Sequence, residues 1–275
     1  MEKGVLKKMI YIQASAVSHL GNSRTNQEDS SIIIYDKRND FGSHNLFSSV
    51  NEKEIPDKQI VGESAILAVS DGMGGHSFGE VASGLTVKYL AERYYAFAQG
   101  GKNEIVAEIA KLNQTVVSVS KENPSYKGMG ATLCGILLRE DKNYVFNVGD
   151  SRAYQFYNGE LLRLTRDHTE GQRLLDLKLL SFDELVTFPK RKSLYKYIGT
   201  KSDLVAEVFE KESFEKGSIL LLCSDGLTDV VTDAEIQNVL SKETSLKNKR
   251  EELLGMALAR NIGCGDNITM ILMQL

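Results

Sequence analysis

The sequence predicts an α+β fold in which antiparallel sheets are covered by helices. Short apolar runs rich in β-branched residues recur along the chain, each bounded by Gly, Asp or Asn, as is typical of strands. Helical periodicity is confined to separate blocks and does not alternate with every strand, which argues against a parallel βαβ sheet. Short connections between successive runs favour antiparallel pairing.

Seven segments are expected to form strands: Ser31–Tyr35, Ala65–Val69, Leu133–Leu138, Tyr144–Val148, Ala153–Tyr157, Ile219–Cys223 and Ile268–Met273. The fourth and fifth are separated only by residues 149–152, GDSR, and this spacing predicts a hairpin. The Asn-Gly pair at 158–159 predicts a second turn, which leads into a strand over Leu161–Leu164.

Apolar residues at helical spacing predict four helices, at residues 78–98, 105–119, 233–240 and 250–262. Ser77-x-x-Glu80 and Thr232-x-x-Glu235 match the capping box, in which a hydroxyl and a carboxylate bond free amides at a helix start. These matches strengthen the prediction of the first and third helices.

The composition indicates one globular domain over residues 1–275, with 42% hydrophobic and 25% charged residues. Residues 36–63 are polar and without regular period, so we expect a surface loop there. The net charge of −4 argues against a nucleic-acid partner, and no apolar run is long enough to cross a membrane. Three dispersed cysteines, Cys134, Cys223 and Cys264, fit buried thiols in the cytoplasm, and we expect a monomer.

Aspartates recur at the ends of the predicted strands. Asp71, Asp150 and Asp225 each follow an apolar run, and Asp266 precedes one. Aspartate often ends a strand because it favours turns, which explains any one of these positions. Four such acids, two of them in Ser-Asp-Gly, instead suggest carboxylates gathered around a cation that offsets their repulsion. Because no His/Cys cluster adjoins them, the expected ions are the hard cations Mg²⁺ or Mn²⁺.

Seven motifs, in order, resemble the metal-dependent serine/threonine protein phosphatases, the PPM or type-2C-like family, in their bacterial form. They are GNSRTNQEDS (21–30), VSDGMGGHSFGE (69–80), GMGATL (128–133), NVGDSRAY (147–154), LTRDHT (164–169), LLLCSDGLTDVV (220–231) and GCGDNIT (263–269). The resemblance covers about residues 12–275. It implies a β-sandwich of two antiparallel sheets flanked by helix pairs, and hydrolysis of phosphoserine and phosphothreonine on proteins, opposing a serine/threonine kinase.

The resemblance also implies roles for individual residues. Asp71 matches the acid that bridges two metal ions, and the carbonyl of Gly72 matches a further ligand. Asp225 and Asp266 match acids that hold one ion, whereas Glu28 and Asp29 match a pair that acts mainly through water. Asp150 and Asp229 match acids of a third, weaker metal site in some members, and Arg24 matches the phosphate-binding arginine. The attacking group would be a water shared by the two cations.

The proton donor to the leaving group is less defined by the sequence. Eukaryotic relatives carry a histidine directly after Asp-Gly, and Met73 stands there in this chain. His76, His168 or a metal-bound water could donate instead, although either histidine could equally have a structural role. We treat His76 as the candidate side chain.

Residues 170–200 correspond by position to the variable flap of the family and include the basic run Pro189–Lys192. This run could attract phosphorylated substrate, or it could be a solvated surface. Two other functions stay open: a non-catalytic phosphoprotein-binding module of the same fold, and a serine esterase. The second rests on Gly75-x-Ser77-x-Gly79, which matches a nucleophile elbow but does not directly follow a strand.

Overall fold

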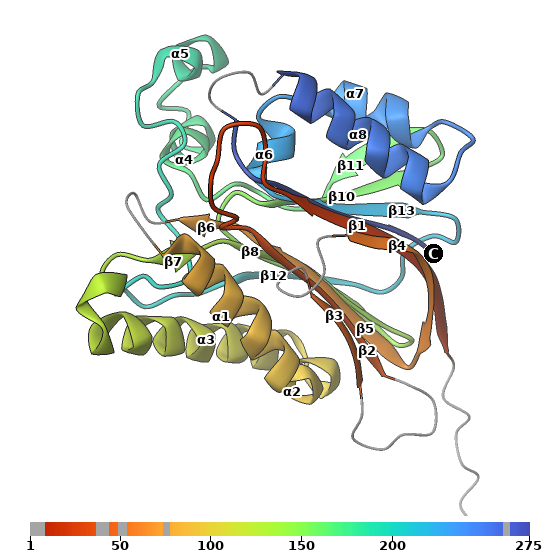
Figure 1. Ribbon diagram of the computed structural model, residues 1–275, viewed down its shortest axis with the longest axis horizontal. Coiled ribbons are helices and arrows are strands. Elements are labelled where there is room, and N and C mark those ends of the chain that lie inside the picture. Colours follow the sequence, from red (N-terminus) through yellow and green to blue (C-terminus); the bar gives the residue numbers. More distant parts are fainter. Residues whose placement is uncertain (1–8, 37–43, 49–53, 74–77, 261–264) are drawn as a thin grey trace, which may run out of the picture.

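The computed structural model describes residues 9–36, 44–48, 54–73, 78–260 and 265–275. Two six-stranded sheets pack face to face, and helices cover both outer faces (Figure 1). All neighbouring strands are antiparallel. The predicted α+β class is therefore confirmed, with the helix–sheet–sheet–helix layers that the family resemblance implied.

The first sheet has the spatial order β11 (Glu160–Arg163), β10 (Arg152–Tyr157), β13 (Ile219–Cys223), β14 (Ile268–Gln274), β1 (Ile10–His19) and β4 (Glu54–Gly62). The second has the order β12 (Glu207–Lys211), β9 (Asn143–Val148), β8 (Leu133–Arg139), β5 (Ser64–Ser70), β2 (Ser30–Asp36) and β3 (His44–Ser48). A short pair, β6 (Gly72–Met73) with β7 (Gly130–Ala131), extends from one end of the second sheet.

The helices fall into three groups. The second sheet is covered by α1 (Gly79–Glu92), α2 (Tyr94–Gln99) and α3 (Lys102–Glu122), and a 3₁₀ turn, η1 (Pro124–Tyr126), follows them. The first sheet is covered by α7 (Asp233–Leu240) and α8 (Leu246–Arg260), with the single turn α6 (Asp225–Thr228) at one end. The short helices α4 (Glu170–Asp176) and α5 (Phe182–Thr187) project from that same end.

Strand periodicity explains how one chain builds three apolar layers. Successive side chains point to opposite faces of a sheet, so a strand buried on both sides is apolar throughout. In β5, Ile66 packs under α1–α3, whereas Leu67 packs between the sheets. In β13, Leu220 packs between the sheets and Leu221 under α7–α8. These strands were predictable for that reason.

Two expectations about the strands are wrong. The range 36–63, expected to be a loop, contains two strands, because β3 pairs with β2 and β4 pairs with β1. Both strands lie at sheet edges, where polar residues are common. The sequence of this range therefore lacks the apolar pattern from which a strand is predicted. The strands β1 and β12 were not predicted.

The second error concerns the hairpin between Tyr144–Val148 and Ala153–Tyr157. The chain crosses there from one sheet to the other, because β9 belongs to the second sheet and β10 to the first. Gly149 makes the turn with φ +106°, and a Cβ on it would lie 2.6 Å from Thr132 Cγ2. The turn Asn158-Gly159 does form the predicted hairpin, with Tyr157 paired to Glu160.

The predicted helices are present with shifted ends. The block 78–98 divides at Arg93 into α1 and α2, the next block is longer as α3, and the last begins earlier as α8. The capping box of Thr232 and Glu235 is confirmed at the start of α7. Ser77 lies outside the described residues, and the N-cap of α1 is Phe78.

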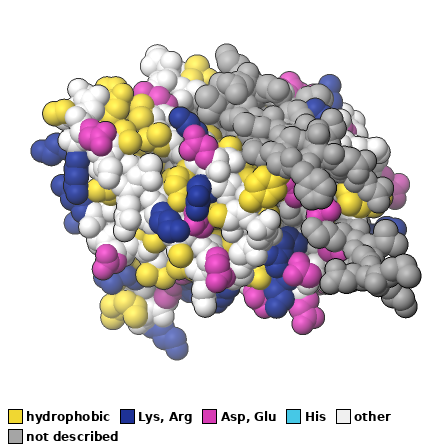
Figure 2. Space-filling model, turned by 90° about the horizontal axis from the view of Figure 1, so that it is seen from below, with side chains coloured by type: hydrophobic (Ala, Val, Ile, Leu, Met, Phe, Trp, Pro, Cys, Tyr) yellow, Lys and Arg dark blue, Asp and Glu magenta, His cyan; other side chains and the backbone are white. Residues whose placement is uncertain are grey.

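None of the helices in the described part of the chain is long and apolar enough to span a membrane. On the face seen from the side of α1–α3, basic and acidic side chains are interspersed among apolar ones (Figure 2).

Candidate metal centre

The predicted acids meet at one end of the sandwich. Asp71 directly follows β5, Asp150 follows β9, Asp225 begins α6 after β13, and Asp266 stands two residues before β14. The elements β6 and α6, which continue from β5 and β13, lie at the same end (Figure 1). Antiparallel pairing of β13 with β14 brings the end of the first beside the start of the second.

Asp71 is held through its backbone. Its N–H donates to Thr132 Oγ1 at 2.9 Å, and its carbonyl accepts from Thr132 N–H at 2.8 Å. The next residue, Gly72, donates its N–H to the carbonyl of Glu28 at 3.1 Å. A Cβ at Gly72 would lie 2.3 Å from the backbone carbon of Gly79, so this close approach requires glycine.

The loop between β1 and β2 carries Arg24, Glu28 and Asp29, and Asn267 fixes it. The Asn267 carboxamide accepts from Glu28 N–H at 2.7 Å and donates to the carbonyls of Leu20 at 2.9 Å and Asn26 at 3.1 Å. Because Asn267 adjoins Asp266, the loop is tied directly to the last predicted acid.

Asp29 is 5% exposed and accepts a hydrogen bond from Ser224 Oγ at 2.7 Å. Ser224 immediately precedes Asp225, so this bond ties Asp29 to the segment that carries Asp225. Thr132, Ser224 and Asn267 were not predicted as site residues, although each lies within a motif quoted above. The signal was available, because each is a short polar residue next to a predicted acid or buried strand.

Burial and mutual repulsion raise the pKa of the clustered carboxyls. Burial is the main cause for Asp71, whose pKa is raised well above its usual value, with further contributions from Asp29, Asp225, Asp150 and Asp266. Burial likewise raises the pKa of Asp29 to about 7, with repulsion from Asp225 and Asp266 adding to it.

The same causes act on the other acids of the cluster. The pKa of Asp150 rises to about 8 through burial and repulsion from Asp225, and that of Asp225 rises to about 6 through burial and repulsion from Asp229 and Asp266. Burial also raises the pKa of Glu28, against the attraction of Arg24. The carboxyls of five separate segments thus act on one another electrostatically.

Two basic side chains bond members of the cluster. Arg24 Nη2 donates to Asp266 Oδ2 at 2.7 Å, and Lys192 Nζ donates to Asp229 Oδ2. These pairs supply part of the positive charge that clustered carboxylates need. Within the described residues, no three His, Cys, Asp or Glu side chains surround a common point as ready-made metal ligands.

The available donors nevertheless fit a hard cation. Asp225 Oδ1 is buried and has no hydrogen-bond partner within the described residues, and the same holds for Glu80 Oε2. Glu80 lies in the first turn of α1, and its charge contributes to the raised pKa of Glu28. It is a further acid of the cluster that was predicted only as a helix cap. A donor set made of oxygen atoms suits Mg²⁺ or Mn²⁺.

His168 has a structural position. Its side chain is 1% exposed, its Nδ1 accepts from Gly149 N–H at 2.9 Å, and its Nε2 lies 3.1 Å from Glu207 Oε1. Burial, followed by repulsion from Lys196, lowers the pKa of His168, which fits a neutral ring. His168 therefore holds the turn before Asp150. Gly75, His76 and Ser77, which include the candidate proton donor and most of the esterase motif, lie outside the described residues.

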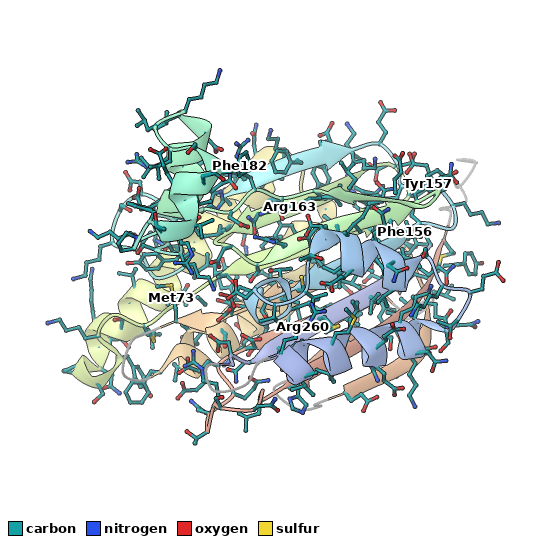
Figure 3. The ribbon with its side chains drawn as sticks, turned by 90° about the horizontal axis from the view of Figure 1, so that it is seen from above. Met73, Phe156, Tyr157, Arg163, Phe182 and Arg260 are labelled. Atoms are coloured by element: carbon teal, nitrogen blue, oxygen red, sulfur yellow. The ribbon has the colours of Figure 1, made fainter. Side chains whose placement is uncertain are left out.

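The segment 170–200 is attached beside the cluster. Backbone bonds join Glu170 N–H to the carbonyl of Ser193 at 2.8 Å and Tyr195 N–H to the carbonyl of His168 at 3.0 Å. Between these anchors, Phe182 lies on α5 (Figure 3) and is 79% exposed. In the basic run Pro189–Lys192, the Lys192 ammonium bonds Asp229, which places the run beside the acids.

Comparisons with known proteins find relatives in both sequence and structure. The family model described as protein phosphatase 2C matches residues 57–260. A serine/threonine phosphatase stp from Listeria welshimeri is 31% identical over 214 residues, covering 76% of this chain and 84% of that protein. The structure of the Streptococcus agalactiae serine/threonine phosphatase aligns with TM-score 0.79 and 25% identity, covering 96% and 99% of the two chains. The catalytic domain of the phosphatase PstP in complex with two manganese ions aligns with TM-score 0.71 and 28% identity, covering 96% and 99%.

Proposed function

This chain belongs to the protein phosphatase 2C family and is a protein serine/threonine phosphatase, and we propose that the acids at the end of its sandwich hold the metal ions on which hydrolysis depends. In this proposal Asp71 would be a ligand shared by the two ions, with the Gly72 carbonyl as a further ligand. Asp225 and Asp266 would hold one of the ions, and Glu28 and Asp29 would act through water. Asp150 and Asp229 would form a third, weaker site.

One observation supports the proposal most strongly. Asp71, Asp29, Asp150, Asp225 and Asp266 come from distant parts of the chain, yet burial and mutual repulsion raise the pKa of Asp71 well above its usual value. A fold that kept these acids together without a counter-charge would lose stability. Bound Mn²⁺ or Mg²⁺ would offset the repulsion and, as Lewis acids, activate water and neutralise phosphate. The related PstP structure holds two manganese ions.

Arg24 would bind the phosphate. Its planar guanidinium matches two phosphate oxygens, and it stands at the edge of the cluster on the loop that Asn267 fixes. Its present bond to Asp266 keeps it within reach of the acids. Asp266 would exchange this bond for the cation, and Arg24 would then donate to substrate. His76 stays the predicted proton donor, since Met73 cannot donate.

The substrates are phosphoproteins, as the family assignment implies. We further propose a single catalytic domain over residues 1–275 that opposes a serine/threonine kinase as a cytoplasmic monomer. The cysteines Cys134 and Cys223 are free and buried, which fits a reducing compartment. The family assignment favours this enzyme over the binding module and the esterase.

The test is hydrolysis of p-nitrophenyl phosphate and of a phosphothreonine peptide. We expect activity with Mn²⁺ or Mg²⁺, none with EDTA, and a loss of at least about a thousandfold in Asp71→Asn. Asn has nearly the same shape as Asp, so an unchanged circular dichroism spectrum would separate loss of metal from loss of fold. Activity in EDTA, or near-native turnover by Asp71→Asn, would contradict the proposal.

A further inference from the structure

A groove lies at the sandwich edge where β11 and β12 are the outermost strands of their sheets. Its volume is about 710 Å³, and it is lined by residues 163–166, at and after the end of β11, and by residues 206–209, in and before β12. Lys102 of α3 and Gln172 of α4 complete it. None of its lining residues belongs to the acidic cluster, so it is a feature distinct from the metal centre. Figure 3 places Arg163 on the strands, apart from Met73 at the end where the acids lie.

The groove follows the edge of β12. Successive side chains of a strand point to opposite faces, so four consecutive lining residues mean that the groove lies along the strand's edge and not over one face. Within the described residues, β12 pairs with β9 on its other side and with no further strand. Its free edge presents unpaired backbone groups to the groove.

One end of the groove, at Glu207, lies near the turn that leads to Asp150. Glu207 pairs with Asn147 near the end of β9, only three residues before Asp150, whereas Phe209 pairs with Val145 further back. Glu207 Oε1 also lies 3.1 Å from His168 Nε2, the residue that holds the turn before Asp150. An extended chain in the groove would therefore point one end toward the acids.

The charges of the groove favour an acidic occupant. Its lining includes Lys102, Arg163 and Arg166 against the single acid Glu207. Arg163 shares Asp167 with Arg152, which already binds that carboxylate twice, at 3.1 and 2.8 Å. One carboxylate thus serves two guanidinium groups. Lys102 has no ion pair within the described residues. Arg166 pairs with Asp176 at the surface, and an exposed pair of this kind is weak enough for Arg166 to exchange Asp176 for a carboxylate of the occupant.

The groove also offers apolar contact. Val208 is buried at its base, and the Phe209 ring is 45% exposed beside it. Apolar surface, free strand edge and positive charge together are the features of a site for an extended peptide, in which backbone bonds supply affinity and side-chain contacts supply selectivity.

We propose that the groove binds an extended acidic segment of the phosphoprotein substrate, which adds as a further strand to β12 while the phosphorylated residue occupies the metal centre. This proposal rests on the phosphatase function proposed above. Lys102 and Arg166 select acidic side chains, and Phe209 contacts an apolar one. Charged contacts of this kind act mainly on the binding of substrate, so their loss should raise KM and leave kcat unchanged.

The first test uses phosphothreonine peptides with a run of Glu on the N-terminal or the C-terminal side, and matched peptides with Gln instead. Wild-type enzyme with Mn²⁺ should show a lower KM for the Glu peptide on at least one side. The double variant Lys102→Gln with Arg166→Gln should raise that KM about tenfold and leave kcat unchanged. The kinetic constants for the Gln peptides and for p-nitrophenyl phosphate should stay the same. The control Lys121→Gln with Lys216→Gln removes the same charge at exposed positions elsewhere and should change nothing.

The second test does not depend on turnover. A fluorescein-labelled Glu peptide without phosphate should bind the Mn²⁺-loaded enzyme, measured by anisotropy, more weakly at high salt and in the double variant. Hydrogen exchange should slow at residues 206–209. Equal binding of Glu and Gln peptides would contradict the proposal that the groove binds an acidic segment. A preference for the Glu peptide that persists in the double variant would contradict it as well. Absence of p-nitrophenyl phosphate hydrolysis would overturn the phosphatase proposal, whereas anisotropy would still decide the groove.

Discussion

A carboxylate at the end of a buried strand has little freedom to move away from its neighbours, because the strand's hydrogen bonds fix its backbone. This is why Asp71 and Asp225 could be predicted from sequence as members of one site. The orientation of Arg24 toward Asp266 could not be predicted, because it depends on how Asn267 ties the β1–β2 loop. Glu80 was missed because its spacing from Ser77 already suggested a helix cap.

His168 gives a prediction at the residue scale. Its lowered pKa means that the unfolded chain takes up a proton below about pH 6.5 more readily than the folded chain does. The stability that neutral His168 contributes is therefore present above pH 6.5 and is lost as pH falls below it. His168→Asn cannot titrate, and its shorter side chain leaves part of the site unfilled, at a cost of about 1–2 kcal/mol at pH 7.5.

Urea unfolding at several pH values checks this prediction. The difference in unfolding free energy between wild type and His168→Asn should narrow from pH 7.5 to pH 5.5. A difference that is constant over this range would mean that His168 titrates equally in the folded and unfolded chain.

Strands that are fully buried could be predicted from the sequence. Strands at sheet edges, which form because they pair with a neighbouring strand, were harder to predict. The central strands β5, β8, β13 and β14 are mostly apolar because both faces are covered. The edge strands β3, β4 and β12 carry polar residues that read as loop. The sequence between β9 and β10 resembles that of a hairpin, but the chain crosses there from one sheet to the other. The Gly149 turn is held by the distant residue His168 and by the neighbouring residue Asn147.

Two capping boxes allow a matched prediction at the scale of the element. Thr232 caps α7, whose Ile236, Val239 and Leu240 are buried, whereas Ser181 caps α5, none of whose residues is buried. Thr232→Ala should lower the free energy of unfolding by about 1 kcal/mol, because α7 must form for the layer over the first sheet to pack.

Ser181→Ala should lower the global stability far less, since α5 can fray while the sandwich stays folded. Urea unfolding of both variants measures this. Equal losses would show that the packing of α7 does not decide the cost of its cap.

At the scale of the whole molecule, the sandwich brings to one end acids that lie up to 238 residues apart, from Glu28 to Asp266. The layers form because successive side chains of the buried strands pack on opposite faces of each sheet, and this pattern allowed the class of fold to be predicted. The order of strands could not be predicted, because it depends on which edges meet when the two sheets pack. That order leaves β11 and β12 as edge strands, and the groove is lined by residues at the end of β11 and along β12.

The most direct measurement is the stoichiometry of Mn²⁺ binding by isothermal titration calorimetry at pH 7.5. Wild-type protein, stripped with EDTA and dialysed, should bind two Mn²⁺ ions, with a third, weaker one at higher concentration, and bound Mn²⁺ should raise its melting temperature. Asp225→Asn should lose at least one of the two stronger ions while remaining folded without metal. Wild type that takes up no Mn²⁺, or an Asp225→Asn isotherm that matches it, would contradict the assignment of these acids as the metal centre.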